Sequence, residues 1–562
     1  MNSLFKKSCA CVLLVFASVG RSGVAVKAAE LSNSTSDAIR LESNAKSAGR
    51  QLAHFWSECV GSGHASLGLR ASWLEQLKLV HDQCGFRYVR FHGLFSDDMF
   101  VYHETTNGLP FYNWQYVDDL FDRMLAIGVR PFVELSFCPK QLASGTNTGF
   151  WWRANTSPPK NNAKWAALVT AFVRHCENRY GVEEVRSWYF EVWNEPDLNF
   201  FWHGTRSQYF ELYKTTAQAI KAVDARLRVG GPATSNFVPD DRFDGERLER
   251  SKVAGLITPA DSEKFPWHPV WVAQFLDYCE REKLPVDFVS THPYPTDWAL
   301  DEAGAQHRLT RQVEATARDL KLLRSIIDHS AFPHAEIQLT EWSSSPSPRD
   351  FSHDCLPAAT FVVQANLESI GLADSLSYWT FSDVFEEGGA GDTIFHGGFG
   401  LVNYQSIVKP TFHAYQFLNE LGDEILAQTN GAIVTRHRDS GKLTALVWHY
   451  PSEMKIAPPQ TDSLKAAEAV MAIGSPAALK LVLTGLPAGA AMELQTLDQT
   501  HGNAVAAWEA MGSPEPPTRE QAAELRKKAM ALKRERLHAD GAGRLVLDQP
   551  IEPWSLVLVQ QQ

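Results

Sequence analysis

Short apolar runs alternate with helical patterns between about residue 50 and residue 420, and this alternation constrains the fold more than any other feature. The clearest helical pattern lies in 165–176, where apolar side chains recur at intervals of three and four residues. Eight strand–helix repeats with nearly continuous apolar strands predict a parallel sheet covered by helices, most simply an α/β fold with a closed (β/α)8 TIM barrel over 46–420. The predicted strands are 54–59, 88–92, 131–136, 188–193, 228–231, 288–292, 337–342 and 376–381.

An open, doubly wound sheet is the alternative interpretation of the same repeats. No Gly-x-Gly-x-x-Gly motif follows an early strand, although such sheets commonly bind dinucleotides there. Polar and aromatic residues gather instead just after the strands, where a barrel places its functional groups. The sequence therefore favours the barrel.

Residues 421–562 show a different sequence pattern, in which short predicted strands are separated by turns rich in Gly, Pro and Asp. This pattern predicts an accessory C-terminal β-sandwich, which a strand from 30–45 could join. One helix is predicted within it, over 518–537, and we interpret its basic cluster as a solvated face because glutamates are interspersed. The predicted strands are 433–436, 443–449, 480–483, 492–497, 544–547 and 555–559.

The first 29 residues resemble a secretory signal peptide. Two lysines precede an apolar run from Cys9 to Val19, and small residues at 28–29 resemble a cleavage site. We therefore expect export to the periplasm or the extracellular space. The six cysteines that follow show no paired spacing, so buried thiols are expected, with one or two disulfides as the alternative.

Composition excludes several classes of function. With 44% hydrophobic and 21% charged residues, the chain is an ordinary globular protein, and its net charge of −12 disfavours nucleic acid as a partner. No later apolar run is long enough for a membrane span, so no membrane association is expected after removal of the signal. No Cys-x-x-Cys or His-Glu-x-x-His motif predicts a metal site, and no cofactor is expected. The oligomeric state stays open.

Two glutamates lie at predicted strand ends. Glu195 follows the fourth strand in Asn-Glu-Pro, and Glu341 ends the seventh in Thr-Glu-Trp. A carboxylate beside tryptophan is costly to bury unless it is paired, hydrogen-bonded or protonated. Two such groups flanking one bond match retaining glycoside cleavage, in which an acid protonates the leaving oxygen and a second carboxylate attacks. The alternative is a structural ion pair with an arginine such as Arg90.

The sum of the motifs resembles glycoside hydrolase family 39, from about His54 to the C-terminus. The motifs are Val60–Ala65, Tyr88–Asp98, Trp193–Leu198, Ser290–Pro295, Thr340–Ser343, Tyr378–Glu387 and His396–Leu401. By this resemblance Glu195 is the acid/base, Glu341 is the nucleophile, and Asn194 holds the hydroxyl beside the anomeric carbon. Asn-Glu-Pro alone is shared by several families with related barrels.

Other residues are expected to bind the sugar or to tune the two glutamates. His292 and Tyr294 are candidate hydrogen-bond donors that keep Glu341 ionised. The remaining candidates would bind hydroxyl groups of the sugar or stack on its faces. Each could instead be an ordinary core residue or part of an ion pair in a loop. These candidates are His92, Glu386, Glu387, Trp342 and Trp379.

The expected substrate is an oligosaccharide or glycoside with a terminal β-D-xylosyl residue. The resemblance includes β-xylosidases and α-L-iduronidases, and an iduronate carboxylate would require a fixed cation. The sixth strand end offers Thr-His-Pro-Tyr-Pro, and the loop after the eighth has no basic residue before Lys409. The alternatives are another neutral-sugar glycosidase, such as a β-glucosidase or an exopolysaccharide hydrolase, an α-L-iduronidase, and a non-catalytic sugar-binding protein.

Overall fold

The computed structural model describes residues 38–235, 237–238, 245–246, 266–300, 306–384 and 387–562. The predicted signal peptide therefore lies outside the described residues. Among the residues described, no helix is long and apolar enough to cross a membrane. The six cysteines in this part of the chain are free and buried, as the prediction of buried thiols requires.

Eight parallel strands close into a barrel in chain order, which confirms the predicted fold class. The strands are β3 (Cys59–His64), β4 (Tyr88–His92), β7 (Arg130–Leu135), β10 (Tyr189–Val192), β11 (Arg228–Thr234), β14 (Phe288–Thr291), β17 (Glu336–Trp342) and β18 (Ser375–Tyr378). Their interior is closed at one end by aromatic rings, including the stacked pair Phe132 and Tyr189.

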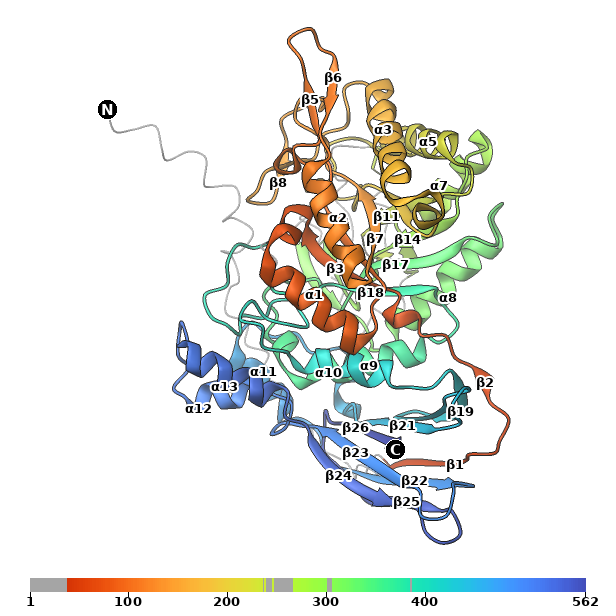
Figure 1. Cartoon of the computed structure of the whole chain (residues 1–562), viewed down its shortest axis with the longest axis vertical. Helices are drawn as coiled ribbons and strands as arrows, with labels where there is room; N and C mark the ends of the chain where they lie inside the picture. The colour runs from red at the N-terminus through yellow and green to blue at the C-terminus, as the bar shows by residue number, and fades with distance from the viewer. Residues whose placement is uncertain (1–37, 236, 239–244, 247–265, 301–305, 385–386) are drawn as a thin grey trace. The chain divides into compact units, whose positions relative to one another are not determined.

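Helices surround these strands (Figure 1). They are α1 (Ala71–Cys84), α2 (Gln115–Ile127), α3 (Asn162–Tyr180), α4 (Val182–Arg186), α5 (Arg206–Val223), α7 (Val272–Glu282), α8 (Ala315–Asp328), α9 (Leu356–Glu368) and α10 (Pro410–Asn419). The buried residues of α3 are those of its predicted apolar face, so burial against the sheet fixes the helix orientation. A capping box between Thr205 and Gln208 fixes the start of α5.

Four antiparallel strand pairs lie in the described parts of the loops after barrel strands. They are β5 (Tyr102–Glu104) with β6 (Pro110–Tyr112), β8 (Thr148–Gly149) with β9 (Ala154–Asn155), β12 (Phe237–Val238) with β13 (His268–Pro269), and β15 (Thr296–Leu300) with β16 (Gln306–Thr310). The β5–β6 hairpin projects farthest from the barrel (Figure 1). All four extend the loop face at which the strands end.

The first barrel strand does not lie where its apolar pattern predicted. Residues 55–57 form a 3-10 turn, and the strand β3 begins at Cys59. The sequence Gly61-Ser-Gly weakens the strand signal, because glycine has low β propensity. Gly61 is nevertheless required, since a Cβ there would lie 2.3 Å from the Trp379 ring.

Two sheets, formed by strands before and after the barrel in the chain, face one another across an apolar core, which agrees with the predicted β-sandwich. One sheet contains β1 (Ala38–Asn44), β22 (Ala477–Thr484) and β25 (Leu545–Ile551). The other contains β2 (Arg50–Gln51), β19 (Glu424–Thr429), β20 (Ala432–Arg436), β21 (Leu443–Trp448), β26 (Leu556–Gln561), β23 (Ala491–Leu497) and β24 (Lys533–His538). The early strand β1 lies beside β22 in parallel register (Figure 1).

The helix predicted over 518–537 is wrong in its second half. Helices α11 (Leu464–Met471), α12 (Val505–Ala510) and α13 (Arg519–Ala529) accompany the sheets, and α13 ends eight residues early. Residues 533–538 instead form β24, an edge strand paired with β23. Its alternating exposed charges fit an edge strand, where lysine and arginine prevent further pairing.

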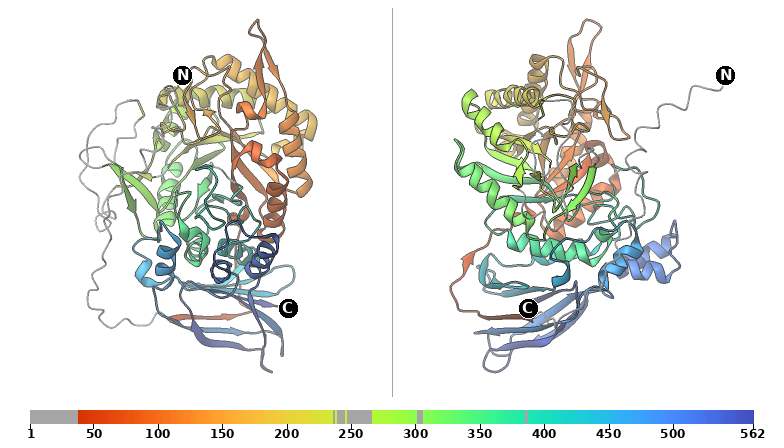
Figure 2. Two further views of the ribbon diagram at one scale, coloured as in Figure 1. Left: turned by 90° about the vertical axis from the view of Figure 1, so that its left-hand side faces the viewer. Right: turned by 180° about the vertical axis from the view of Figure 1, so that it is seen from behind.

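One face of the large sheet shares a hydrophobic core with the barrel, while its other face packs on the three-stranded sheet. The predicted boundary at residue 420 stays a prediction. Trp554, Leu556 and Leu558 belong to the same cluster of buried residues as the barrel helices. Thr360 on α9 donates a hydrogen bond to the carbonyl of Trp554 at 2.7 Å. Figure 1 and Figure 2 show the sheets against the side of the barrel that α9 and α10 cover.

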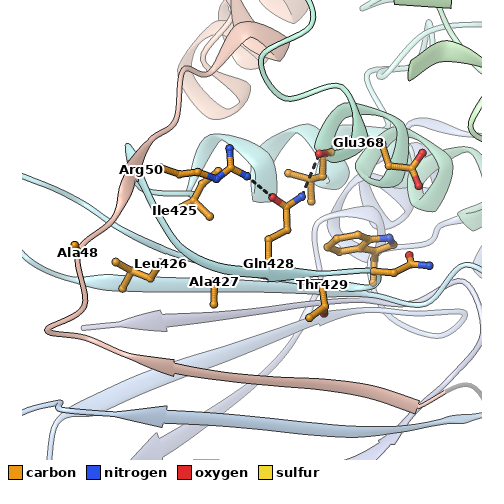
Figure 3. A pocket seen from close by; sticks show the side chains of 11 residues that line it. Ala48, Arg50, Glu368, Ile425, Leu426, Ala427, Gln428 and Thr429 are labelled. Atoms are coloured by element: carbon orange, nitrogen blue, oxygen red, sulfur yellow. Dashed lines mark hydrogen bonds between the residues drawn. The ribbon is translucent and has the colours of Figure 1, made fainter. Parts of the chain in front are cut away.

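A cavity of about 600 Å³ lies where the end of α9 meets β19. Arg50 donates to Gln428 at 2.9 Å, and Gln428 donates to the carbonyl of Leu367 at 3.2 Å (Figure 3). Glu368 and Trp448 line the same cavity. These bonds connect the β1–β2 region, the large sheet and the barrel.

Candidate active site

Glu195 and Glu341 come together where β10 and β17 end. Glu195 lies three residues after β10, and Glu341 is the penultimate residue of β17. Both are buried, with 8% and 6% exposure. One carboxylate oxygen of each lies within 4.8 Å of the other. The pairing expected from the sequence is therefore present in the fold.

The backbone at Glu195 is held in an unusual conformation. Its φ of 40° lies in the left-handed region, which a non-glycine residue adopts only at a cost of about 1–3 kcal/mol. The Glu195 amide donates to the carbonyl of Ala233 at 2.8 Å, and Asp197 accepts a hydrogen bond from the Ser235 amide at 2.8 Å. The end of β11 and the residue that follows it thus fix the turn that orients the Glu195 side chain.

Arg90 on β4 lies at the centre of the site. It is fully buried, and its guanidinium donates to Glu341 Oε1 at 2.8 Å, to Glu191 Oε2 at 2.6 Å and to Asn194 Oδ1 at 2.8 Å. A fourth contact joins Arg90 to Glu134 at 2.9 Å. Glu341 therefore forms an ion pair with Arg90 and also lies in the site beside Glu195. From the sequence, an ion pair and a catalytic role were alternative interpretations.

Sequence reasoning missed Glu134 and Glu191, which lie inside predicted strands. Both carboxylates are buried, and a charged residue in a continuously apolar strand was the available signal, because buried charges need partners. Burial by itself would raise the pKa of Glu134, but His92 and Arg90 outweigh it and lower that pKa. These anions hold Arg90 in place beneath Glu341.

The two central glutamates differ electrostatically. Burial, followed by the charge of Glu341, raises the pKa of Glu195 well above its ordinary value. Burial also raises the pKa of Glu341, but the adjacent Arg90 and His92 oppose that rise. The proton of the pair therefore belongs on Glu195, and Glu341 is the group stabilised as a carboxylate.

His292 contacts a different glutamate from the one expected. Its Nδ1 lies 2.9 Å from Glu195 Oε1 and 3.7 Å from Glu341 Oε2. Tyr294 donates to Glu341 Oε2 only at the long distance of 3.5 Å. The expectation that His292 donates to Glu341 is therefore wrong, because Arg90 occupies that role and His292 lies against Glu195.

Asn194 and His92 lie around the carboxylate pair. Asn194 is fully buried, its Oδ1 accepts from Arg90, and its Nδ2 has no hydrogen-bond partner among the described residues. That amide hydrogen is available to a hydroxyl of a bound sugar. His92 Nδ1 lies 2.7 Å from Glu134 and its Nε2 lies 3.6 Å from Glu341. Burial by itself would lower the pKa of His92, but Glu134 outweighs it and raises that pKa, so His92 contributes positive charge to the site as well as a ring surface.

The two tryptophans lie in different surroundings. Trp379 packs beside His92, with ring centroids 4.8 Å apart, at the end of β18. Trp342 is fully buried between Phe361 of α9 and Tyr378, with ring centroids 5.8 Å and 6.2 Å away. Successive side chains of a strand point to opposite faces, so Trp342 points toward the helix layer while Glu341 points inward. This position does not support a stacking role for Trp342.

The loop after β18 supplies one described candidate. Glu386 lies outside the described residues, whereas Glu387 is half-buried. Burial and the charge of Glu341 raise the pKa of Glu387 to about 7. Glu387 therefore lies within the electrostatic influence of the nucleophile candidate.

An aromatic wall, defined here as Phe150, Trp152, Phe200 and Phe201, stands beside His92 and was not predicted. The Phe150 and Phe201 rings lie 5.9 Å and 6.3 Å from His92. Phe150 also contacts Trp152 at 5.1 Å and Phe200 at 5.1 Å. These residues come from the loops after β7 and β10, whose length and aromatic content were the available signal.

The family model for glycosyl hydrolases family 39 matches residues 39–544, which is most of the chain. The chain belongs to glycosyl hydrolases family 39. It is accordingly a glycoside hydrolase, and its substrate is a glycoside or an oligosaccharide. The closed barrel agrees with this family, since a solved family 39 enzyme from Xanthomonas axonopodis matches in structure with a TM-score of 0.79 at 33% identity, covering 92% of this chain and 96% of that one.

Two relatives and one solved structure illustrate the similarity to other family 39 proteins. A β-xylosidase from Geobacillus stearothermophilus is 39% identical over 479 residues, covering 83% of this chain and 84% of that protein. A β-xylosidase from Caldicellulosiruptor saccharolyticus is 36% identical over 526 residues, covering 91% and 95%. A monomeric β-xylosidase from Caulobacter crescentus matches in structure with a TM-score of 0.79 at 34% identity, covering 93% of this chain and 99% of that one.

The family 39 site also contains a candidate set of metal ligands. Glu195, His292 and Glu341 each bring one ligand atom to within 4.8 Å of the others, and no second group of this kind occurs in the described part of the chain. Two of these atoms lie only 2.9 Å apart, which is a hydrogen-bond distance between Glu195 and His292. Their direct bond, together with Arg90 on Glu341, accounts for the cluster without assigning it a metal.

Proposed function

We propose that this family 39 enzyme is a retaining β-xylosidase. Glu195 protonates the leaving oxygen and Glu341 attacks the anomeric carbon, forming a covalent glycosyl–enzyme intermediate that water then hydrolyses with Glu195 as base. The observation that supports this best is the separation of the two carboxylates, below 4.8 Å between one oxygen of each. Retaining glycosidases hold their carboxyl groups about 5–5.5 Å apart, whereas inverting enzymes leave about 6.5–9.5 Å for a water molecule.

The electrostatics of the site support these two roles. An acid must keep its proton near neutral pH, and burial beside Glu341 favours the protonated form of Glu195. A nucleophile must stay ionised, and Arg90 favours the carboxylate of Glu341. Activity should therefore fall at high pH as Glu195 loses its proton and at low pH as Glu341 gains one.

A neutral xyloside is supported by the relatives and by the charges near the site. Both relatives reported above are named β-xylosidases. Lys409, the cation nearest in sequence after β18, is buried and paired with Asp354 at 2.7 Å and Asp383 at 2.6 Å. A lysine engaged in this way is poorly placed to bind a uronate carboxylate.

The test is an NMR time course with an aryl β-D-xyloside, recording which anomer of xylose forms before mutarotation. Initial β-xylose supports both the sugar and the retaining mechanism, and Glu341→Ala should abolish turnover. Initial α-xylose would contradict the nucleophilic role of Glu341. Absence of cleavage, with turnover of an aryl glucoside, arabinoside or iduronide instead, would reject the xyloside while keeping the hydrolase.

We also propose that residues 1–29 are a signal peptide and that the enzyme is exported. The basic, apolar and small-residue segments in that order support this proposal. N-terminal sequencing of the protein from its native cells should give residue 30 as the first residue. A chain that begins at Met1 and remains in the cytoplasm would reject it.

A further inference from the structure

A chain of hydrogen bonds connects Glu195 to Arg90 beneath the mouth of the site. His292 Nδ1 lies 2.9 Å from Glu195 Oε1, and His292 Nε2 lies 3.0 Å from Thr340 Oγ1. Thr340 Oγ1 donates to Glu191 Oε1 at 2.7 Å, and Glu191 Oε2 accepts from Arg90 Nε at 2.6 Å. The intermediate members, His292, Thr340 and Glu191, are all at most 1% exposed. The proposed mechanism so far gives Thr340 no role.

The direction of each bond follows from the number of hydrogens available. Burial raises the pKa of Glu191, but the charge of Arg90 opposes that rise, and Arg90 Nε donates to Glu191 Oε2 at 2.6 Å. Glu191 paired in this way is a carboxylate and can only accept, so the single hydroxyl hydrogen of Thr340 goes to Glu191. Thr340 Oγ1 must then accept from His292, which places a hydrogen on Nε2. A neutral imidazole has one N–H, so Nδ1 is bare and can only accept. Glu195 is therefore the donor in its bond to His292.

A charged His292 would break this argument, because both of its nitrogens would then donate. Burial, followed by the positive charges of Arg90 and His92, lowers the pKa of His292 well below its ordinary value. The imidazole is therefore neutral at neutral pH. The geometry and the surrounding charges give the same location for the proton.

We infer that Thr340 is a positioning residue, which fixes the tautomer of His292 and thereby keeps a proton on Glu195 in the free enzyme. This inference rests on the proposed role of Glu195 as the acid/base. Thr340 does not touch the reacting atoms, and it acts only through His292. Its neighbour Glu341 lies one position farther along β17, so the strand that holds the nucleophile also orients the acid.

The same tautomer serves both halves of the reaction. When Glu195 gives its proton to the leaving oxygen, the glycosidic bond breaks, its electron pair stays on that oxygen, and Glu341 forms the new bond to the anomeric carbon. The Glu195 carboxylate then faces a bare Nδ1, which offers it no hydrogen bond. It therefore accepts a proton readily from the attacking water, whose oxygen bonds to the anomeric carbon as the bond to Glu341 breaks. This step restores the acid on Glu195 and the carboxylate of Glu341.

Other charged groups also face Glu195 and His292, and a test must leave them in place. Replacing Thr340 changes no charge. Thr340→Val removes the acceptor of the His292 Nε2 hydrogen and the bond that Thr340 donates to Glu191, which stays paired with Arg90. The groups that face Glu195 are Glu341 on β17, Asp197 in the loop after β10, Glu387 after β18, Tyr294 after β14 and Arg90 on β4. The groups that face His292 are Arg90 and His92 on β4, together with Glu195 and Glu341.

The kinetic test compares Thr340→Val with Thr340→Ser. Valine removes the acceptor of the Nε2 hydrogen, so the hydrogen prefers Nδ1, donates to Glu195 and stabilises its carboxylate. We expect the basic limb of the pH profile of kcat/KM on an aryl xyloside to move about one unit lower, the size of one hydrogen bond, whereas serine leaves it in place. An unmoved limb in Thr340→Val, even with reduced kcat, would overturn the inference.

A second measurement does not depend on activity. NMR of the free enzyme with 15N-labelled histidine, with His292→Gln used for assignment, should find His292 protonated on Nε2 in the natural chain and on Nδ1 in Thr340→Val. An active xylosidase with the proton on Nδ1 would reject the inference and leave the proposed function intact. The expected tautomer in a protein that cleaves no xyloside would reject the proposed substrate and leave the hydrogen-bond chain intact.

Discussion

Individual side chains at this site depend on partners from several strands. Arg90 binds groups from β7, β10, β17 and the turn after β10, so its charge organises residues distant in sequence. Asn194 shows the consequence, because Arg90 fixes its Oδ1 and leaves its Nδ2 without a partner among the described residues. The orientation of Asn194 in the free enzyme is thus the one needed to donate to a sugar hydroxyl.

Asn194→Ala should lower kcat/KM on an aryl xyloside by roughly 100-fold, or about 2.7 kcal/mol, because a hydrogen bond to the 2-hydroxyl strengthens in the transition state. Steady-state kinetics on the xyloside and on its 2-deoxy analogue would measure this. The deficit of the variant should largely disappear on the analogue. An equal deficit on both substrates would contradict a bond to that hydroxyl.

At the scale of the elements, the loops after the barrel strands and the end of α9 carry features that the strands themselves do not. The aromatic wall comes from two loops and borders His92. Phe200 is 50% exposed, as expected for a ring that would cover the sugar beyond the scissile bond. The end of α9 places Glu368 at the cavity beside β19.

Phe200→Ala should raise KM for xylo-oligosaccharides about three- to ten-fold, the size of one aromatic contact, while changing kcat little. Kinetics on xylotriose would measure this. As a control, Met530→Ala removes an exposed apolar side chain at the end of α13 and should leave KM unchanged. A Phe200 variant with unaltered KM would mean that the wall does not contact substrate.

Glu368→Gln should stabilise the protein at high pH only. Burial raises the pKa of Glu368 to about 7, and its Oε2 has no hydrogen-bond partner within the described residues. A carboxyl whose pKa is raised in the folded state loses stability as pH rises from about 4.5 to 7, and glutamine avoids that loss. We expect a gain of about 1–2 kcal/mol at pH 8 and none at pH 4.

Thermal unfolding at both pH values would test this prediction. Gln364→Ala is a suitable control, because it removes the donor to Glu368 Oε1 at 2.9 Å while leaving the carboxyl present. This control should increase the pH dependence, since the carboxylate would lose its hydrogen bond. A Glu368→Gln variant equally stabilised at both pH values would show that ionisation is not the cause.

At the scale of the whole molecule, the barrel and the C-terminal sheets depend on each other. The buried cluster is continuous from the barrel helices to Trp554. His413 on α10 contacts the carbonyl of Ala529 on α13 at 2.8 Å, and Phe395 in the loop after β18 packs on Trp508 at 5.5 Å. The loop face of the barrel is thus also connected to the C-terminal helices.

Trp554→Ala should destabilise the full chain by about 3–5 kcal/mol, because it leaves a large cavity in this shared core. Denaturant unfolding followed by fluorescence would measure the loss. Val546→Ala on β25, where the side chain is 39% exposed, should cost less than about 1 kcal/mol. A barrel produced as residues 46–420 alone, with undiminished stability, would contradict the mutual dependence.

The sequence by itself determined the barrel, the β-rich C-terminal region and the positions of Glu195 and Glu341. These features follow from local periodicity and from polar residues that end apolar runs, both of which are readable over a few neighbouring residues. The prediction from sequence was wrong where contacts between distant residues overrode a local pattern. At β3, Gly61 makes room for Trp379, and at β24, pairing with β23 replaced a helix.

Only the tertiary structure decided which partners the functional groups have. Arg90 and Glu191 lie 101 residues apart, and His292 and Glu195 lie 97 residues apart, so no local pattern could pair them. Hydrogen-bond direction and the protonation of a buried carboxyl depend on every group within a few ångströms. The chemistry of Glu195 therefore depends on the closed barrel, which brings the ends of β4, β10, β14 and β17 together.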